Sequence, residues 1–269
     1  MDMSDAPSIR PPAVAGLFYP DDPLALREIV QSCLDAALVP PHPPQLRALI
    51  APHAGYLYSG PIAGTAFANL RGVHSITTVI VIGPSHHLHF DGIATTPARA
   101  FATPLGEIPL HPPARETLRS FPWIVSLPEA HRNEHAIEVE LPFLQVVLPQ
   151  ADLIPLVTGK ATPQQVAQTL AALATTDATL ILVSSDLSHY LPQRAAVTLD
   201  RQTADAIEAR TPQRISPHQA CGHLAIQGLL LEAQRRSLIP QTLDLRTSAD
   251  TAGEPQRVVG YGAFSFSSS

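Results

Sequence analysis

Basic residues are few in this chain. It carries 17 lysines and arginines against 23 aspartates and glutamates, which gives a formal net charge of −6, and the basic residues form no cluster. Proteins that bind nucleic acid or an anionic membrane present concentrated positive charge, because the groups they contact are negatively charged. We therefore expect no nucleic-acid or membrane partner, and a small molecule of unknown identity as the ligand or substrate.

Long apolar runs, an export signal and a set of cysteines are missing as well. No apolar stretch reaches the roughly 18 residues that a membrane span needs, and the acidic start lacks the apolar core of a signal peptide. The only cysteines are Cys33 and Cys221. A chain with a full core has little need of a disulfide, so we expect a cytoplasmic protein with both thiols reduced.

No repeat, linker or low-complexity tract divides the sequence. Its 269 residues can bury one substantial core, and we expect residues 1–269 to form a single domain with residues 1–10 as a flexible N-terminus. The 28 prolines are scattered, and Pro23 and Pro163 each occupy the first position of an expected helix. The prolines therefore punctuate an ordered fold.

Apolar runs and one-sided helical patterns alternate along the chain. The expected strands are 48–51, 78–82, 153–157, 179–183, 241–248 and 258–267. The expected helices are 24–34, 59–70, 114–120, 134–147, 164–174, 200–210 and 218–236, with short extended pieces within 91–113. This alternation is typical of an α/β three-layer sandwich. The last two strands are more amphipathic and suit antiparallel pairing, so we expect a mixed, largely parallel sheet.

Histidine follows three of these strands. His53 comes after the first, His86 and His87 come after the second, and His189 follows the strand at 179–183. Ligands of parallel sheets bind beyond the carboxyl ends of the strands, so these imidazoles are expected to meet at one edge and form a metal or acid–base site. His86 and His87 are adjacent and point to opposite sides of an extended segment, and spacing does not decide which of them is a ligand.

Cys221 is the better chemical candidate of the two cysteines. It lies near the start of helix 218–236, where free amide groups and the helix dipole favour a thiolate. Cys33 falls on the apolar face of its own helix and is expected to be a small buried apolar residue. Two imidazoles and one thiolate form an open site that accepts zinc, iron or copper. A buried Cys221 without a chemical role is the competing interpretation.

Glu134, His135 and Asp186 are candidates for supporting roles. Glu134 and His135 open helix 134–147, where an acidic residue usually serves the helix dipole. If they point into the cleft instead, they supply hydrogen bonds to a metal ligand, and both interpretations stay open. Asp186 precedes His189 and could orient its imidazole. Ser85 lacks the G-x-S-x-G surroundings of a nucleophilic serine, which argues against a serine hydrolase.

Six ordered segments of the chain resemble a known family. They are residues 12–20, 51–60, 83–87, 134–143, 184–189 and 221–222. On these segments the chain resembles the Memo family, whose prokaryotic members are called AmmeMemoRadiSam system protein B. The resemblance implies a fold like that of the class III extradiol ring-cleaving dioxygenases. It also implies that His53, His86 and Cys221 are metal ligands and that His189 is the acid–base histidine. From the residues themselves, we expect His87, Glu134, His135 and Asp186 to lie around them.

The third ligand departs from the dioxygenases, which hold iron through two histidines and a carboxylate. A thiolate is softer, favours copper or zinc more than a carboxylate does, and is itself oxidised by O2. Likeness of fold therefore does not assign ring cleavage. The resemblance implies one metal ion, with Fe(II) favoured over copper or zinc, and a pathway link to a radical-SAM protein.

Three functions are compatible with these residues, and whether the protein is an enzyme stays open. The first is a metal-dependent oxidoreductase of dioxygenase type with unknown substrate, in which His189 moves a proton. The second is a non-catalytic copper- or iron-binding redox protein, or one that binds a partner. The third is a zinc-dependent hydrolase in which His189 or Glu134 is the base.

Overall fold

The structure, a computed structural model, describes residues 9–37 and 45–268. Its α-helices are α1 (Pro23–Asp35), α2 (Tyr56–Ala68), α3 (Ala114–Arg119), α4 (Pro128–Arg132), α5 (Leu141–Val147), α6 (Pro163–Leu173), α7 (Gln193–Glu208) and α8 (His223–Arg235). Its strands are β1 (Ile9–Arg10), β2 (Leu46–Ala51), β3 (Thr78–Pro84), β4 (Ile93–Thr95), β5 (Ala100–Thr103), β6 (Gly106–Pro109), β7 (Ile124–Ser126), β8 (Asp152–Thr158), β9 (Thr179–Ser184), β10 (His189–Leu191), β11 (Ile239–Thr247) and β12 (Val258–Ser267). Within the described residues, no helix combines the length and apolar character of a membrane span.

The large sheet is mixed, with a parallel centre. Its strand order is β10-β12-β2-β9-β3-β8-β4-β7, and β11 pairs with β12. The central strands β2, β9, β3 and β8 run parallel to one another. Strand β12 is antiparallel to both β2 and β11, which confirms the predicted mixed sheet. The three strands expected to carry histidine therefore lie side by side as β2, β9 and β3, and their carboxyl ends share one edge.

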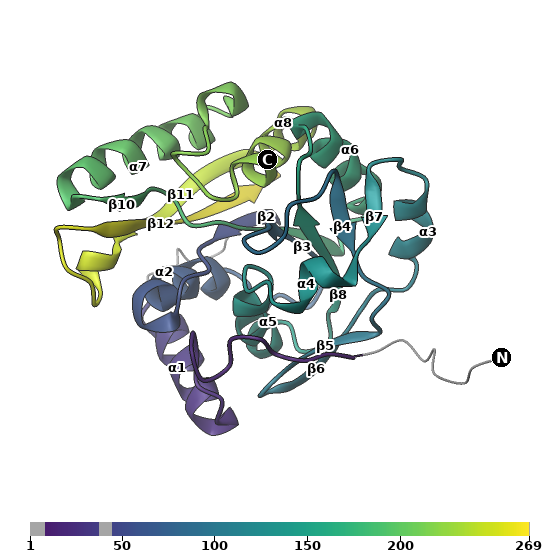
Figure 1. The fold of residues 1–269 in the computed structure, drawn as a ribbon, viewed down its shortest axis with the longest axis horizontal. Coiled ribbons are helices and arrows are strands. Elements are labelled where there is room, and N and C mark those ends of the chain that lie inside the picture. Colours follow the sequence, from purple (N-terminus) through teal and green to yellow (C-terminus); the bar gives the residue numbers. More distant parts are fainter. Residues whose placement is uncertain (1–8, 38–44, 269) are drawn as a thin grey trace.

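Helices cover both faces of this sheet, as Figure 1 shows. Leu49 and Ala51 of β2 belong to the apolar cluster that contains buried residues of α1, α2 and α5. Ala48 and Ile50 of the same strand belong to the cluster that contains those of α6, α7 and α8. Since successive strand residues point to opposite faces, an uninterrupted apolar strand fills two helix layers. The expected three-layer α/β architecture is confirmed.

The helix expected at 134–147 begins later than predicted. A 3₁₀ turn spans Glu138–Glu140 and α5 begins only at Leu141, with Pro142 in its first turn. Proline has no amide hydrogen to donate and suits a helix start better than a helix interior. Glu134 and His135 therefore lie in a loop, and the helix-dipole interpretation of Glu134 is wrong.

Two other helices also differ from expectation. The helix predicted at 218–236 is α8, which begins at His223, so Cys221 precedes the helix. The helix predicted from 200 begins at Gln193, and the short strand β10 before it contains His189. Strand β10 pairs irregularly with β12. The residues of β10 are at most partly buried, so the strand has no apolar run by which the sequence could indicate it.

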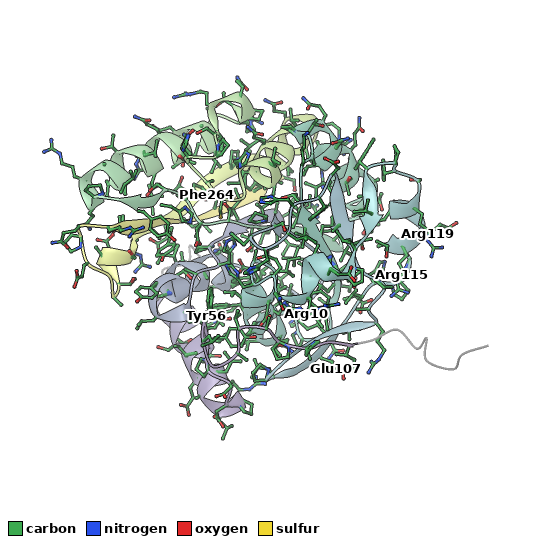
Figure 2. All side chains as sticks on the ribbon, in the orientation of Figure 1. Arg10, Tyr56, Glu107, Arg115, Arg119 and Phe264 are labelled. Carbon is green, nitrogen blue, oxygen red and sulfur yellow. The ribbon has the colours of Figure 1, made fainter. Side chains whose placement is uncertain are left out.

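The N-terminal segment is held inside the fold by Arg10. Of the ten residues expected to be flexible, 1–8 lie outside the described residues, whereas Ile9–Arg10 form β1 and pair with β5. The Arg10 guanidinium is buried and forms an ion pair with the buried Glu138. It also donates to the carbonyl oxygens of His131 (2.9 Å) and Glu134 (2.6 Å). Figure 2 shows Arg10 inside the molecule, while Arg115 and Arg119 extend from α3 at its edge.

Candidate metal centre

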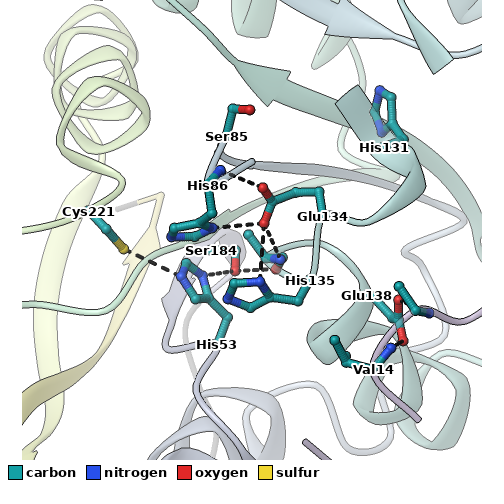
Figure 3. A network of polar contacts seen from close by, with 12 residues as sticks. Val14, His53, Ser85, His86, His131, Glu134, His135, Glu138, Ser184 and Cys221 are labelled. Carbon is teal, nitrogen blue, oxygen red and sulfur yellow. Dashed lines mark hydrogen bonds and ion pairs between the residues drawn. The ribbon is translucent and has the colours of Figure 1, made fainter. Parts of the chain in front are cut away.

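Three strand ends and one helix start bring the candidate ligands together. One ligand atom from each of His53, His86 and Cys221 lies within 4.8 Å of the other two. His53 follows β2 and His86 follows β3, while Cys221 precedes α8 and lies beside the end of β9 through its contacts with Ser185 and Asp186. Figure 3 shows the three side chains converging on one point. The sequence-based pairing of these distant residues thus has a matching geometry.

His53 is oriented by Ser184, the last residue of β9. His53 is almost fully buried at 1% exposure, and its Nδ1 lies 2.7 Å from Ser184 Oγ. The Ser184 hydroxyl donates to the Ala136 carbonyl at 2.5 Å, so it is an acceptor toward His53. This assigns the imidazole proton to Nδ1 and makes Nε2 the acceptor, 3.4 Å from Cys221 Sγ, so that a metal would take the place of the thiol proton. Burial, with the nearby His86, lowers the pKa of His53 to about 3, so the ring is neutral.

Glu134 orients His86 in a comparable way. Its Oε1 lies 2.8 Å from His86 Nδ1, and its Oε2 accepts a hydrogen bond from the His86 backbone at 2.6 Å. The Ala136 amide also donates to Oε1. These contacts hold the pKa of Glu134 at about 2 despite its burial. A carboxylate on Nδ1 directs Nε2 of His86 outward, the arrangement that metal-binding histidines use.

His135 completes a stack of imidazoles. Its ring lies 4.5 Å from that of His86 in a stacked arrangement and 5.4 Å from that of His53 in an edge-on one. Burial lowers the pKa of His135 to about 4, and neighbouring imidazoles add to this effect. His86, Glu134 and His135 also form a second group whose ligand atoms lie within 4.8 Å of one another. In that group Glu134 is already bonded to His86, so we regard the group with Cys221 as the candidate site.

Cys221 does not become a thiolate merely through its position. Burial and the Asp186 carboxyl raise the pKa of its thiol to about 12, while Ser185 and the Gly222 amide oppose this only in part. The expectation that a helix start favours the thiolate here is therefore wrong for the metal-free protein. Gly222 is needed beside it, because a Cβ at that position would lie 2.7 Å from Ser185 Cβ. A cation between the thiol and two neutral imidazoles is what would stabilise the thiolate.

The remaining predicted residues lie around this centre. Asp186 accepts a hydrogen bond from the His53 backbone at 2.9 Å, so it anchors the loop of His53. In the part of the chain that the structure describes, the Asp186 side chain forms no hydrogen bond with His189, although the His189 charge affects the pKa of both His53 and Asp186. His87 is exposed, and its ring centre lies 6.1 Å from that of His135, outside the ligand group.

Sequence reasoning missed one residue that shapes the site, Ser184. The sequence places Ser184 in the segment 184–189 without indicating a role for it, whereas in the structure its contact fixes the tautomer of His53. Its position at the carboxyl end of a central strand was the available signal. Ser85, by contrast, bonds to the Leu88 carbonyl at 2.7 Å and closes a turn, in keeping with the weak case for a nucleophile.

Glu134→Gln is expected to weaken metal binding by about 10–100-fold. The carboxylate charge both orients His86 and increases the basicity of its imidazole, and the amide lacks this charge. Metal affinity would be measured by competition with a chromophoric chelator. Glu129→Gln is the matched control, since Glu129 is exposed and its ion pair with Arg132, at 3.8 Å, lies on the surface. Equal affinity of the Glu134 variant and the wild type would show that His86 is not a ligand.

An α/β fold with two imidazoles and a thiol converging at the carboxyl edge of its sheet defines a class of proteins with a candidate metal pocket. The model of the Memo-like protein family matches residues 10–265. The chain belongs to this family.

Curated relatives agree with this assignment, and a solved structure shares the fold. A MEMO1 family protein of Sulfolobus acidocaldarius is 34% identical, over 94% of this chain and 97% of that protein. One from Methanothermobacter thermautotrophicus is 33% identical, over 96% of this chain and 100% of its own length. The crystal structure of the uncharacterized protein JW3007 from Escherichia coli K12 is similar in fold, with a TM-score of 0.53 over 80% of this chain and 99% of that one. At 12% identity the likeness extends to the fold alone.

Proposed function

We propose that this Memo-like protein binds one redox-active metal ion through His53, His86 and Cys221 and uses it to oxidise a small molecule with O2. The observation that carries the proposal is the approach of the three ligand atoms to within 4.8 Å of one another. The donor set fits a metal, because each imidazole has one nitrogen held by Ser184 or Glu134 and the other free. Fe(II) is favoured and copper is the alternative for this oxidation, whereas zinc has no redox chemistry and belongs to the hydrolase alternative.

A bound metal would supply the binding and activation of O2 in this scheme. The protein's own residues hold the ligands and handle protons. Ser184 and Glu134 keep the two imidazoles in the tautomers that leave Nε2 free. His189 is the proposed proton-transfer residue, because it is partly exposed and its charge reaches the pocket of His53 and Asp186. Glu134 is a poor candidate for the general base of a hydrolase, because both of its carboxylate oxygens already accept hydrogen bonds from His86.

The test is elemental analysis of anaerobically purified protein, followed by O2 consumption with a panel of aromatic substrates. We expect iron or copper, and O2 uptake that requires a substrate. His189→Gln should keep the metal and lose roughly 10²–10⁴-fold in turnover, the usual contribution of a proton-transfer group. The matched control is His74→Gln, which replaces an exposed loop histidine.

Two results would contradict the proposal. Zinc in the protein together with turnover in the absence of O2 would favour hydrolysis. Uptake of O2 without substrate, with oxidation of Cys221, would show that the thiolate rather than a substrate is oxidised.

A further inference from the structure

A cleft of about 520 Å³ opens beside Cys221. This volume lies in the range of small-molecule sites. The lining residues combine apolar, hydroxyl, imidazole and charged side chains: Pro84, Ser85, Leu88, His89, Phe90, Asp91, Thr158, Gly159, Lys160, Cys221, His223 and Leu224. Because Cys221 belongs to both, the cleft adjoins the candidate metal centre.

Lys160 is the only lysine in the 269 residues, and the sixteen other basic residues are arginines. None of those arginines lines the cleft. Strands β3 and β8 pair Pro84 with Thr158, and His86 and Lys160 each follow two residues beyond that pair. The single lysine and the proposed ligand His86 therefore leave neighbouring parallel strands at the same edge of the sheet.

The backbone of Lys160 is fixed from both sides. Its amide donates to the Phe90 carbonyl at 2.8 Å, and its carbonyl accepts from the Gly92 amide at 2.9 Å. The crossing is so close that a Cβ at Gly159 would lie 2.3 Å from the Phe90 carbonyl oxygen. Because the backbone is fixed, only the four-carbon side chain of the lysine can change its conformation within the cleft.

The Lys160 ammonium forms no ion pair among residues 9–37 and 45–268, although Asp91 is the β-bridge partner of Lys160. Asp91 also lines the same cleft. The same cleft has an apolar wall formed by Pro84, Leu88, Phe90 and Leu224. A ligand that pairs with the ammonium and also packs on this wall needs an anionic group and an apolar body.

We propose that the cleft binds a small organic acid, with its carboxylate on Lys160 and its apolar body against the wall of Leu88, Phe90 and Leu224. The far end of such a molecule lies toward Cys221. The claim that this acid is the substrate rests on the proposed function, whereas the claim that it binds does not need a metal.

The single lysine allows a direct test on the metal-free full-length chain. Reductive ¹³C-methylation labels Lys160 and the N-terminal amine only, and a Lys160→Gln sample identifies which signal belongs to the lysine. Benzoate, its neutral analogue benzamide, and acetate are titrated while the dimethylammonium signal is followed by NMR. We expect a saturable shift with benzoate, and binding of benzamide and of acetate that is about tenfold weaker, or about 1.4 kcal/mol each.

Variants separate this proposal from the metal site. Benzoate binding, followed on the ligand signals, should weaken about tenfold in Lys160→Gln and stay unchanged in Arg119→Gln, which removes an exposed cation from α3. Because the titration uses metal-free protein, a failure of metal binding leaves this result intact. Equal binding of benzoate and benzamide, equal binding of benzoate and acetate, or unchanged binding in Lys160→Gln would each overturn the proposal.

Discussion

Glu138→Gln is expected to lower the free energy of unfolding by about 3–5 kcal/mol, the usual cost of removing one partner of a buried ion pair. Glu138 is fully buried, and every neighbour that it bonds is a donor. Its carboxylate accepts hydrogen bonds from the Ala13 amide at 2.7 Å, the Val14 amide at 2.9 Å and the Tyr19 hydroxyl at 2.5 Å, in addition to Arg10.

The effect follows from charge and from hydrogen-bond direction together. A glutamine places an NH₂ group where only donors face it, and it leaves the Arg10 guanidinium buried without its counter-charge. Burial and the Glu138 carboxylate also raise the pKa of Tyr19, so its hydroxyl stays a donor. Arg10 further holds the carbonyls of His131 and Glu134, so the same change loosens the loop that carries Glu134.

Denaturant unfolding followed by circular dichroism measures this loss. Glu129→Gln removes a carboxylate from a surface pair with Arg132 and should cost at most about 1 kcal/mol. Arg10→Met combined with Glu138→Gln should be less destabilising than the sum of the two single changes, because the unpaired charge is gone. A Glu138→Gln variant as stable as the Glu129 control would refute the assigned role of this network.

The large sheet was predictable because its signal is local. Uninterrupted apolar runs such as Val79–Ile82 reflect burial on both faces, and a strand leaves that pattern wherever it lies in the centre of a sheet. The short edge strand at His189 is half-exposed and leaves no such pattern. The roles of Glu134 and Glu138 depend on contacts with residues that are distant in sequence, which a local pattern does not reveal.

The approach of the three ligands was predictable from topology, whereas their state was not. Three parallel strands with histidine after them suffice to bring His53 and His86 to one edge. The pKa of Cys221 depends on burial and on Asp186, and the tautomer of His53 depends on Ser184. Such effects arise only when the chain has folded, so sequence motifs identify the residues but not their protonation.

His53→Ala and Cys221→Ser are each expected to abolish stoichiometric metal binding. Loss of a ligand costs more than the roughly 10–100-fold that loss of an outer contact costs, since only two protein ligands then remain. Wild-type protein, reconstituted without O2 and freed of loose metal, should hold about one equivalent, consistent with one three-ligand site. Cys33→Ser is the matched control, because it makes the same atom exchange in the other cysteine, on α1.

The pH dependence of metal affinity is a second measurement that tests this prediction. A thiol with a pKa near 12 is protonated at neutral pH, so metal binding must displace its proton. The affinity of the wild type should therefore rise with pH, by about tenfold per unit from this group alone, until the pH nears the thiol pKa. Cys221→Ser should lose both the affinity and this part of the slope, whereas His53→Ala loses affinity and keeps it, since the thiol must still be deprotonated. A Cys221→Ser protein that is folded by circular dichroism and binds metal with wild-type affinity and slope would place the metal on other residues, with His86, Glu134 and His135 as the next group to test.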